Sequence, residues 1–153
     1  MRLGADRGEV GAATFATWFG EGEGCPLGVL PGASMAAARE RWGEPVRLAD
    51  GHHVYAFPVD DPAGNQRRLE LHLRPSGATV SGTRARLISR DRMDLDAAWR
   101  PIKEHLDRVH GAPAREVGPV LVFAWRSREG FVVRASRYRA DNGDQLLEVL
   151  TER

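Results

Sequence analysis

Two segments of the chain share one pattern of landmarks, and this internal repeat constrains the fold more than any other feature. Each segment has a helical stretch that stops at a Gly-x-Pro, first at Gly43 and again at Gly111. Each stop precedes a short aromatic run, Val54-Tyr55-Ala56-Phe57 and then Val122-Phe123-Ala124-Trp125. Both landmarks recur at an offset of 68 residues, from 43 to 111 and from 55 to 123. Self-similarity at a fixed spacing dictates architecture, so we expect two related structural units.

Composition indicates an ordinary globular protein. The 153 residues are 42% hydrophobic and 28% charged, enough to bury a real core. A net charge of +1 gives no overall attraction to nucleic acid or anionic lipid. Cys25 is the only cysteine, which excludes an intramolecular disulfide. The first ten residues carry acids where a secretory signal needs an apolar run, and no segment has the length of a membrane span. We expect a cytoplasmic protein.

The first unit is predicted to be a helix followed by three strands. Ser34 is a suitable N-cap, and Gly43 supplies a C-terminal stop. Residues 54–59 alternate as a strand, and leucines at 69, 71 and 73 alternate with polar residues in a second strand. A third strand is expected at about 80–88, after a turn at 75–77.

The second unit repeats this order after a hinge at 91–94. Leu95, Trp99, Ile102, Leu106 and Val109 have the spacing of an amphipathic helix. Pro101 should either kink this helix or mark a start near residue 100. Residues 120–125 are apolar on both faces, which favours a central strand. Runs at 131–139 and 145–150 flank an Asn-Gly dipeptide, which predicts a hairpin.

The predicted fold class is α+β, with two tandem helix-strand-strand-strand units that form an antiparallel sheet with helices on one face. The units span residues 27–90 and 91–153, and together make one globular domain. They could join edge to edge in one sheet or pack as separate lobes. Residues 1–26 form a partly flexible N-terminal segment, in which 12–19 is a short helix or a strand covering one edge. Trp42 and Trp99 are expected to be buried anchors between helices and sheet.

No pattern in the sequence predicts catalysis, a metal site or a cofactor. His52 and His53 are adjacent, so on a strand they point to opposite faces. The spacing of His105 and His110 is not that of a helical zinc pair. The paired aspartates lie in turns, where Asp is favoured by its backbone hydrogen bonds. No serine lies in a nucleophile elbow, and Cys25 has no histidine partner motif.

The polar face of the predicted sheet is the candidate binding surface. If the leucines of 69–73 point into the core, the residues between them point outward, and neighbouring strands add further polar side chains. Arginine, tyrosine and histidine are typical of recognition surfaces. The alternative is a sheet face that is merely solvated. The candidate partner-binding residues are Glu70, His72, Arg74, Arg84, Arg86, Arg134 and Tyr138.

The stretch Leu27-Gly28-Val29-Leu30-Pro31-Gly32-Ala33-Ser34-Met35, the Ala-rich helix after it and Trp42-Gly43-Glu44-Pro45 resemble a unit of small bacterial proteins. They are similar to immunity proteins of polymorphic toxin systems, and more loosely to the tandem helix-plus-sheet inhibitor of β-lactamases. The resemblance covers residues 27–90 well and 95–150 weakly, and the second unit departs from it at Pro101.

This resemblance implies a non-catalytic protein that binds a cognate protein toxin and covers its active site. Such a task needs complementary shape and charge but no chemistry of its own. The alternative is a nucleic-acid-binding module that uses the arginine-rich sheet face. The near-zero net charge makes nucleic acid the less favoured partner. A small enzyme of unknown type is a third possibility, because catalytic residues can assemble without a sequence motif.

Overall fold

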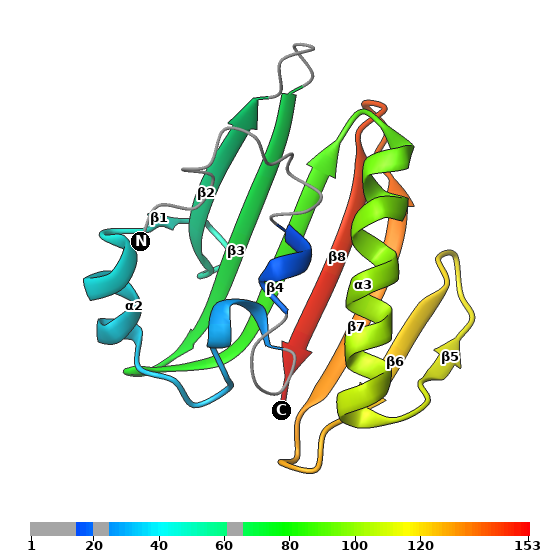
Figure 1. Ribbon diagram of the computed structural model, residues 1–153. Helices are drawn as coiled ribbons and strands as arrows, with labels where there is room; N and C mark the ends of the chain where they lie inside the picture. Colours follow the sequence, from blue (N-terminus) through cyan, green and yellow to red (C-terminus); the bar gives the residue numbers. More distant parts are fainter. Residues whose placement is uncertain (1–14, 20–24, 61–65) are drawn as a thin grey trace.

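The computed structural model describes residues 15–19, 25–60 and 66–153, and it contains one antiparallel sheet (Figure 1). Within these residues the sheet has eight strands in the order β1-β2-β3-β4-β8-β7-β6-β5. Helices lie in front of it as it is drawn in Figure 1. Their bounds are Pro26–Gly28 for the 3-10 helix η1, Met35–Trp42 for α2 and Arg92–His110 for α3. The strands are β1 Val46–Arg47, β2 His53–Asp60, β3 Gln66–Ser76, β4 Thr79–Ser89, β5 Ala114–Glu116, β6 Val122–Arg126, β7 Val132–Arg139 and β8 Gln145–Glu152.

The strand order has the symmetry that the repeat predicts. The order is the same from either edge, because β1 to β4 fill one half of the sheet and β5 to β8 fill the other. The two halves join where β4 pairs with β8, antiparallel, over eight residue pairs from Gly82↔Glu152 to Ser89↔Gln145. The α+β class is therefore confirmed, and the two units form a single sheet. Each unit also has a short edge strand, β1 or β5, that the sequence did not predict.

The repeat offset changes from 68 to 64 within the sheet. Phe57 and its counterpart Trp125 are 68 residues apart, but their pairing partners Leu69 and Val133 are 64 apart. The reason is the length of one hairpin. The β2–β3 ladder continues three pairs beyond Phe57, whereas the β6–β7 ladder continues one pair beyond Trp125. Two extra pairs place four extra residues in the first unit.

Both helices have the caps that the sequence predicts or allows. The Ser34 hydroxyl accepts a hydrogen bond from the Ala37 amide at 3.2 Å and caps α2. The Asp91 carboxylate accepts one from the Met93 amide at 2.9 Å and caps α3, so the expected hinge at 91–94 is already helical from Arg92. Each helix ends at a glycine with positive φ, 87° at Gly43 and 84° at Gly111, a conformation that favours glycine.

Pro101 lies inside α3, so the predicted start of this helix near residue 100 is wrong. A proline has no N–H to donate to the carbonyl four residues earlier, which here belongs to Ala97. Both residues are exposed, and water can therefore satisfy that carbonyl. Burial of the opposite side of α3, through Leu95, Ala98 and Ile102, holds the helix together across this position.

The core lies between the helices and one face of the sheet, here called the inner face. Alternate residues of the four central strands supply it, among them Leu69, Leu71, Leu87 and Leu147, all fully buried. The N-terminal aromatics also belong to it. Residues 15–17 are helical and lie in front of the centre of the sheet (Figure 1). Of the two alternatives for 12–19, the short helix is confirmed for the described part and the strand covering one edge is wrong, because Phe15, Trp18 and Phe19 are buried in this core.

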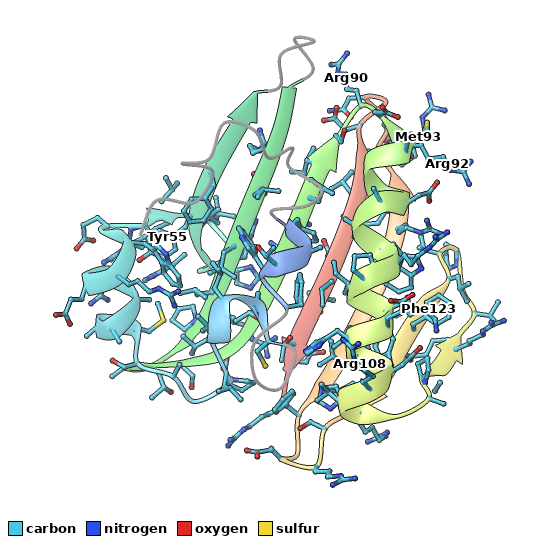
Figure 2. The ribbon with its side chains drawn as sticks, viewed as in Figure 1. Tyr55, Arg90, Arg92, Met93, Arg108 and Phe123 are labelled. Carbon is cyan, nitrogen blue, oxygen red and sulfur yellow. The ribbon has the colours of Figure 1, made fainter. Side chains whose placement is uncertain are left out.

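Two further expectations need correction. The strand over 120–125 is not central: β6 is next to the edge strand β5, and its Val122 and Ala124 are only half-buried. The tryptophans expected as anchors are also half-buried. Trp42, the last residue of α2, packs against Tyr55, and Trp99 of α3 packs against Phe123; Figure 2 labels these two partners. The amphipathic stripe of α3 is wide, and its outer margin remains in contact with solvent.

Trp125 is the aromatic anchor of the second unit. Its ring is 1% exposed, and its indole N–H donates to the Asp107 carboxylate of α3 at 3.0 Å. We predict that Trp125→Ala lowers the free energy of unfolding by about 3–5 kcal/mol, as is usual for a buried aromatic. Trp99→Ala should cost less because its ring is partly solvated. Urea melts of the two variants test this, and a larger loss at Trp99 would contradict the assignment.

Candidate functional site

The face of the sheet opposite the inner face is covered by none of the described helices, and we call it the open face. The strand register places alternate polar residues on it in rows that run across the strands. One row holds Arg74, Gly82 and Glu152, a second holds His72 and Arg84, and a third holds Glu70, Arg86 and Glu148. The sheet therefore gathers residues from strands far apart in the sequence onto one surface.

All the residues predicted from sequence as a binding surface lie on the open face. Glu70 is opposite Arg86 and His72 is opposite Arg84, while Arg134 and Tyr138 follow on β7. Their exposure is not uniform. The Arg74 side chain is 48% exposed, but His72 is only 4% exposed, so this histidine is not one of the solvated residues that the alternation suggested.

A chain of ion pairs crosses the seam between the two units. The Arg74 guanidinium lies 3.4 Å from the Glu152 carboxylate, and Arg134 contacts the other oxygen of that carboxylate at 3.1 Å. Arg134 also donates to Glu116 at 3.0 Å. Arg74 can reach Glu152 because Gly82, between them in the row, has no side chain to block the path. These contacts link β3, β8, β7 and β5.

A second group of polar side chains crosses the same seam two rows away. The Arg86 Nε donates to the Glu148 carboxylate at 2.7 Å, and the Tyr138 hydroxyl donates to the same carboxylate oxygen at 3.1 Å. Burial opposes the charge on Arg86, but the hydrogen bond and charge of Glu148 outweigh it and raise the Arg86 pKa. Burial and the nearby Glu148 charge raise the pKa of Tyr138, which keeps it protonated as a donor.

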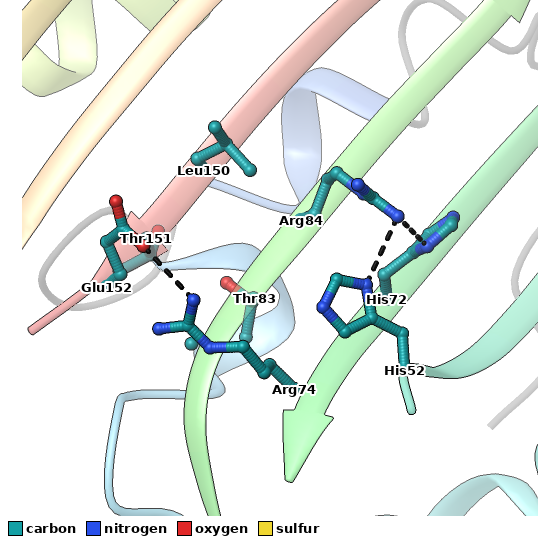
Figure 3. A pocket seen from close by; sticks show the side chains of 9 residues that line it. His52, His72, Arg74, Thr83, Arg84, Leu150, Thr151 and Glu152 are labelled. Carbon is teal, nitrogen blue, oxygen red and sulfur yellow. Dashed lines mark hydrogen bonds and ion pairs between the residues drawn. The ribbon is translucent and has the colours of Figure 1, made fainter. Parts of the chain in front are cut away.

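Arg84 organises a pair of histidines. The Nη2 atom of Arg84 lies 2.8 Å from His72 Nδ1 and 3.2 Å from His52 Nδ1 (Figure 3). An arginine only donates hydrogen bonds, so both Nδ1 atoms face it as acceptors. Nδ1 of His52 also lies 3.4 Å from the Asp50 carboxylate. The Nε2–H of His72 then donates to Glu70 at 2.9 Å. This hydrogen bond outweighs burial and lowers the Glu70 pKa, so the carboxylate stays charged.

A small hollow lies beside these histidines, above Gly82. Its volume is about 40 Å³, and Arg74 and Arg84 both line it; the Arg84 side chain is turned toward the two histidines and that of Arg74 toward Glu152 (Figure 3). A Cβ at position 82 would lie 2.8 Å from the Thr151 carbonyl oxygen and 3.5 Å from Arg74 Nη2. The lining residues are His52, His72, Arg74, Gly82, Thr83, Arg84, Leu150, Thr151 and Glu152.

Sequence reasoning missed several residues of this surface. Glu148 and Glu152 alternate on β8 with buried residues, and this alternation was a signal in the sequence that places them on the open face. His52 precedes β2, and nothing in its local sequence indicates contact with Arg84, which is 32 residues away. Gly82 looks like an ordinary strand glycine. Its importance comes from the close approach of β8, a tertiary feature.

The described residues contain no group of three or more His, Cys, Asp or Glu side chains that could hold a metal ion. None of the described helices is both long and apolar enough to span a bilayer. Comparison with known proteins yields no matching family, no matching curated protein and no matching solved structure.

We predict that Gly82→Ala destabilises the protein by about 1–3 kcal/mol, the usual cost of overpacking. The added methyl group would collide with the backbone of β8, which cannot move without disturbing the seam. Gly118→Ala is the matched control, because the nearest atom to its Cβ would be 3.9 Å away. Chemical denaturation measures both variants, and an equal response would contradict a close approach at Gly82.

Acid should weaken the fold through His52. Burial lowers its pKa below the ordinary 6.5; Asp50 opposes this shift, whereas Arg84, His72 and Arg74 add to it. The His52 imidazole therefore binds a proton more readily in the unfolded chain than in the folded one. The stability that comes from the neutral imidazole is fully present above pH 6.5, and it is lost as the pH falls through the folded-state pKa of His52.

The measurement compares wild type with His52→Gln in urea melts between pH 8 and 5. The free energy of unfolding of the wild type should fall relative to that of the variant as the pH drops below about 6.5. The lowered pKa values of His53 and His105 contribute equally to both proteins. A constant difference across this range would contradict the assignment.

Proposed function

We propose that this chain is a non-catalytic, immunity-type protein that binds a cognate bacterial toxin through the open face of its sheet. The observation that carries the proposal is the lattice of linked polar side chains on a sheet face that no described helix covers. Arg74, Glu152 and Arg134 are held by one another, as are Arg86 and Glu148. A recognition surface whose side chains are already fixed loses little conformational entropy on binding.

The charge pattern supports a protein partner over nucleic acid. Each of Arg68, Arg74, Arg86 and Arg134 on this face contacts a glutamate, so positive and negative groups alternate across the strands. Nucleic acid is bound by basic tracks that neutralise successive phosphates. An alternating surface instead favours a partner with complementary charges of both signs, which gives specificity and speeds encounter.

The test is co-expression with a small toxin domain encoded next to this chain. We predict that Arg74→Gln combined with Arg134→Gln weakens toxin binding at least about thirtyfold, because the interface would then bury Glu152 without a counterion, at a cost of about 2 kcal/mol or more. Glutamine is preferable to glutamate here because both arginines contact Glu152, and reversed charges would gather three carboxylates. Isothermal titration gives the affinity, and cell survival gives the protection.

The matched control is Arg100→Gln combined with Arg108→Gln. Both of these arginines are exposed on α3, on the other side of the sheet, and their loss changes the net charge equally. Thermal melts establish that both double variants fold. Protection by the open-face variant equal to that of the control would remove this face as the binding surface. Cells that survive no better with the wild-type chain than without it would refute the toxin-inhibitor function.

A further inference from the structure

One half-buried cation of the open face, Arg84, lacks a contacting counterion among the described residues. Among the described residues, Arg84 lies within ion-pairing distance of no carboxylate, and its Nη2 contacts the Nδ1 atoms of His52 and His72. Its Nε–H is buried and has no acceptor there. Arg68, Arg74, Arg86 and Arg134 on the same face each contact a glutamate, whereas Arg126, which contacts none, is exposed. Asp50 acts on Arg84 through its charge, but its carboxylate contacts His52 and not Arg84. A half-buried charge is normally in contact with a counterion, so the missing contact is informative.

The position of Arg84 says where a counterion would bind. Arg84 lines the hollow above Gly82 together with Arg74; its Nη2 is turned toward the histidines, and the Arg74 side chain is turned toward Glu152 (Figure 3). His52 also lines this hollow. In the tautomer whose Nδ1 accepts from Arg84, the Nε2 of His52 carries a hydrogen that can be donated. The hollow is therefore lined by two arginines and one imidazole, all of which are hydrogen-bond donors.

The size and lining of the hollow select the kind of anion. About 40 Å³ has room for roughly three water-sized groups. This space is enough for the three heavy atoms of a planar carboxylate. Glu152 also lines the hollow, and its negative charge disfavours a dianion more than a single charge. Arginine recognises carboxylates well through paired N–H donors.

We propose that the hollow above Gly82 receives an acidic side chain, Asp or Glu, from the protein partner, which supplies the counterion of Arg84 and adds a second carboxylate beside Arg74. This inference rests on the proposed function for the identity of the partner. The carboxylate site itself belongs to this chain alone and can be tested without any partner.

The probe is N-acetyl-glutamate α-amide, which carries one side-chain carboxylate, and its matched control is N-acetyl-glutamine α-amide. Two-dimensional NMR follows the Arg74 and Arg84 Nε–H signals and the His52 ring signals while each compound is added at constant ionic strength. We expect saturable shifts with the glutamate derivative, at a dissociation constant of about millimolar for so small a contact. The glutamine derivative should give no saturable shift.

Two variants locate the site. Arg74→Gln and Arg84→Gln should each weaken the glutamate derivative about tenfold or more, while Arg100→Gln on α3 should bind it as the wild type does. Amide spectra show whether each variant is folded; Arg74→Gln, which leaves the histidine contacts in place, provides the test if Arg84→Gln unfolds. Equal shifts with both amides, or unchanged binding by Arg74→Gln, would overturn the proposal.

A titration with inorganic phosphate is a further test. Tighter binding of phosphate than of the carboxylate probe would also overturn the proposal, in favour of a phosphate-bearing ligand. Because no toxin is present in these titrations, their failure leaves the co-expression result standing. Conversely, carboxylate binding by a chain that gives no protection would retain the site and reject the toxin as its partner.

Discussion

The pairing of β4 with β8 is the interaction on which the rest of this structure depends. It joins the two units over eight residue pairs, and both strands are buried at the centre of the sheet. Each unit alone would leave a long strand with an unpaired edge, which is a site for aggregation. Pairing these two edges also merges two small cores into one, and larger cores bury a greater fraction of the chain's surface.

The same seam determines the geometry of the open face. Because β4 and β8 are antiparallel and in fixed register, Arg86 faces Glu148, and Gly82 stands between Arg74 and Glu152. None of these contacts lies within one unit. The polar lattice is thus a product of the association of the two halves, and an error in that register would separate its charges as surely as it would disrupt the core.

Local patterns in the sequence predicted most of the secondary structure. Ser34 and Gly43 bounded α2, alternating leucines located β3, and Asn142-Gly143 marked the β7–β8 hairpin. Each of these signals acts over a few residues. The unpredicted features depend on distant contacts: the edge strands, the burial of the aromatics at 15–19, and the non-central position of β6. Apolar residues on both faces of β6 were mistaken for central burial, although neighbours at the edge only half-cover them.

The candidate site likewise has features that local patterns predict and features that depend on distant contacts. Parity along each strand predicted which residues share the open face, since alternation is a local property. It did not predict their partners, because the pairing of β4 with β8 is not written in either strand alone. His72 illustrates the difference: alternation placed it on the outer side, but Arg84 and His52 from other parts of the chain cover it.

A surface of mutually paired charges constrains how a partner can bind. Removing such groups from water is costly, and a partner gains little net free energy by replacing one ion pair with another. Paired residues therefore contribute mainly to the rejection of wrong partners, whose charges would be left unmatched. Arg84 differs because its charge is already partly desolvated and faces the imidazoles of His52 and His72. A carboxylate from a partner would meet a cation that has lost much of its hydration and has no pair to give up, so affinity can be gained there without breaking the lattice around it.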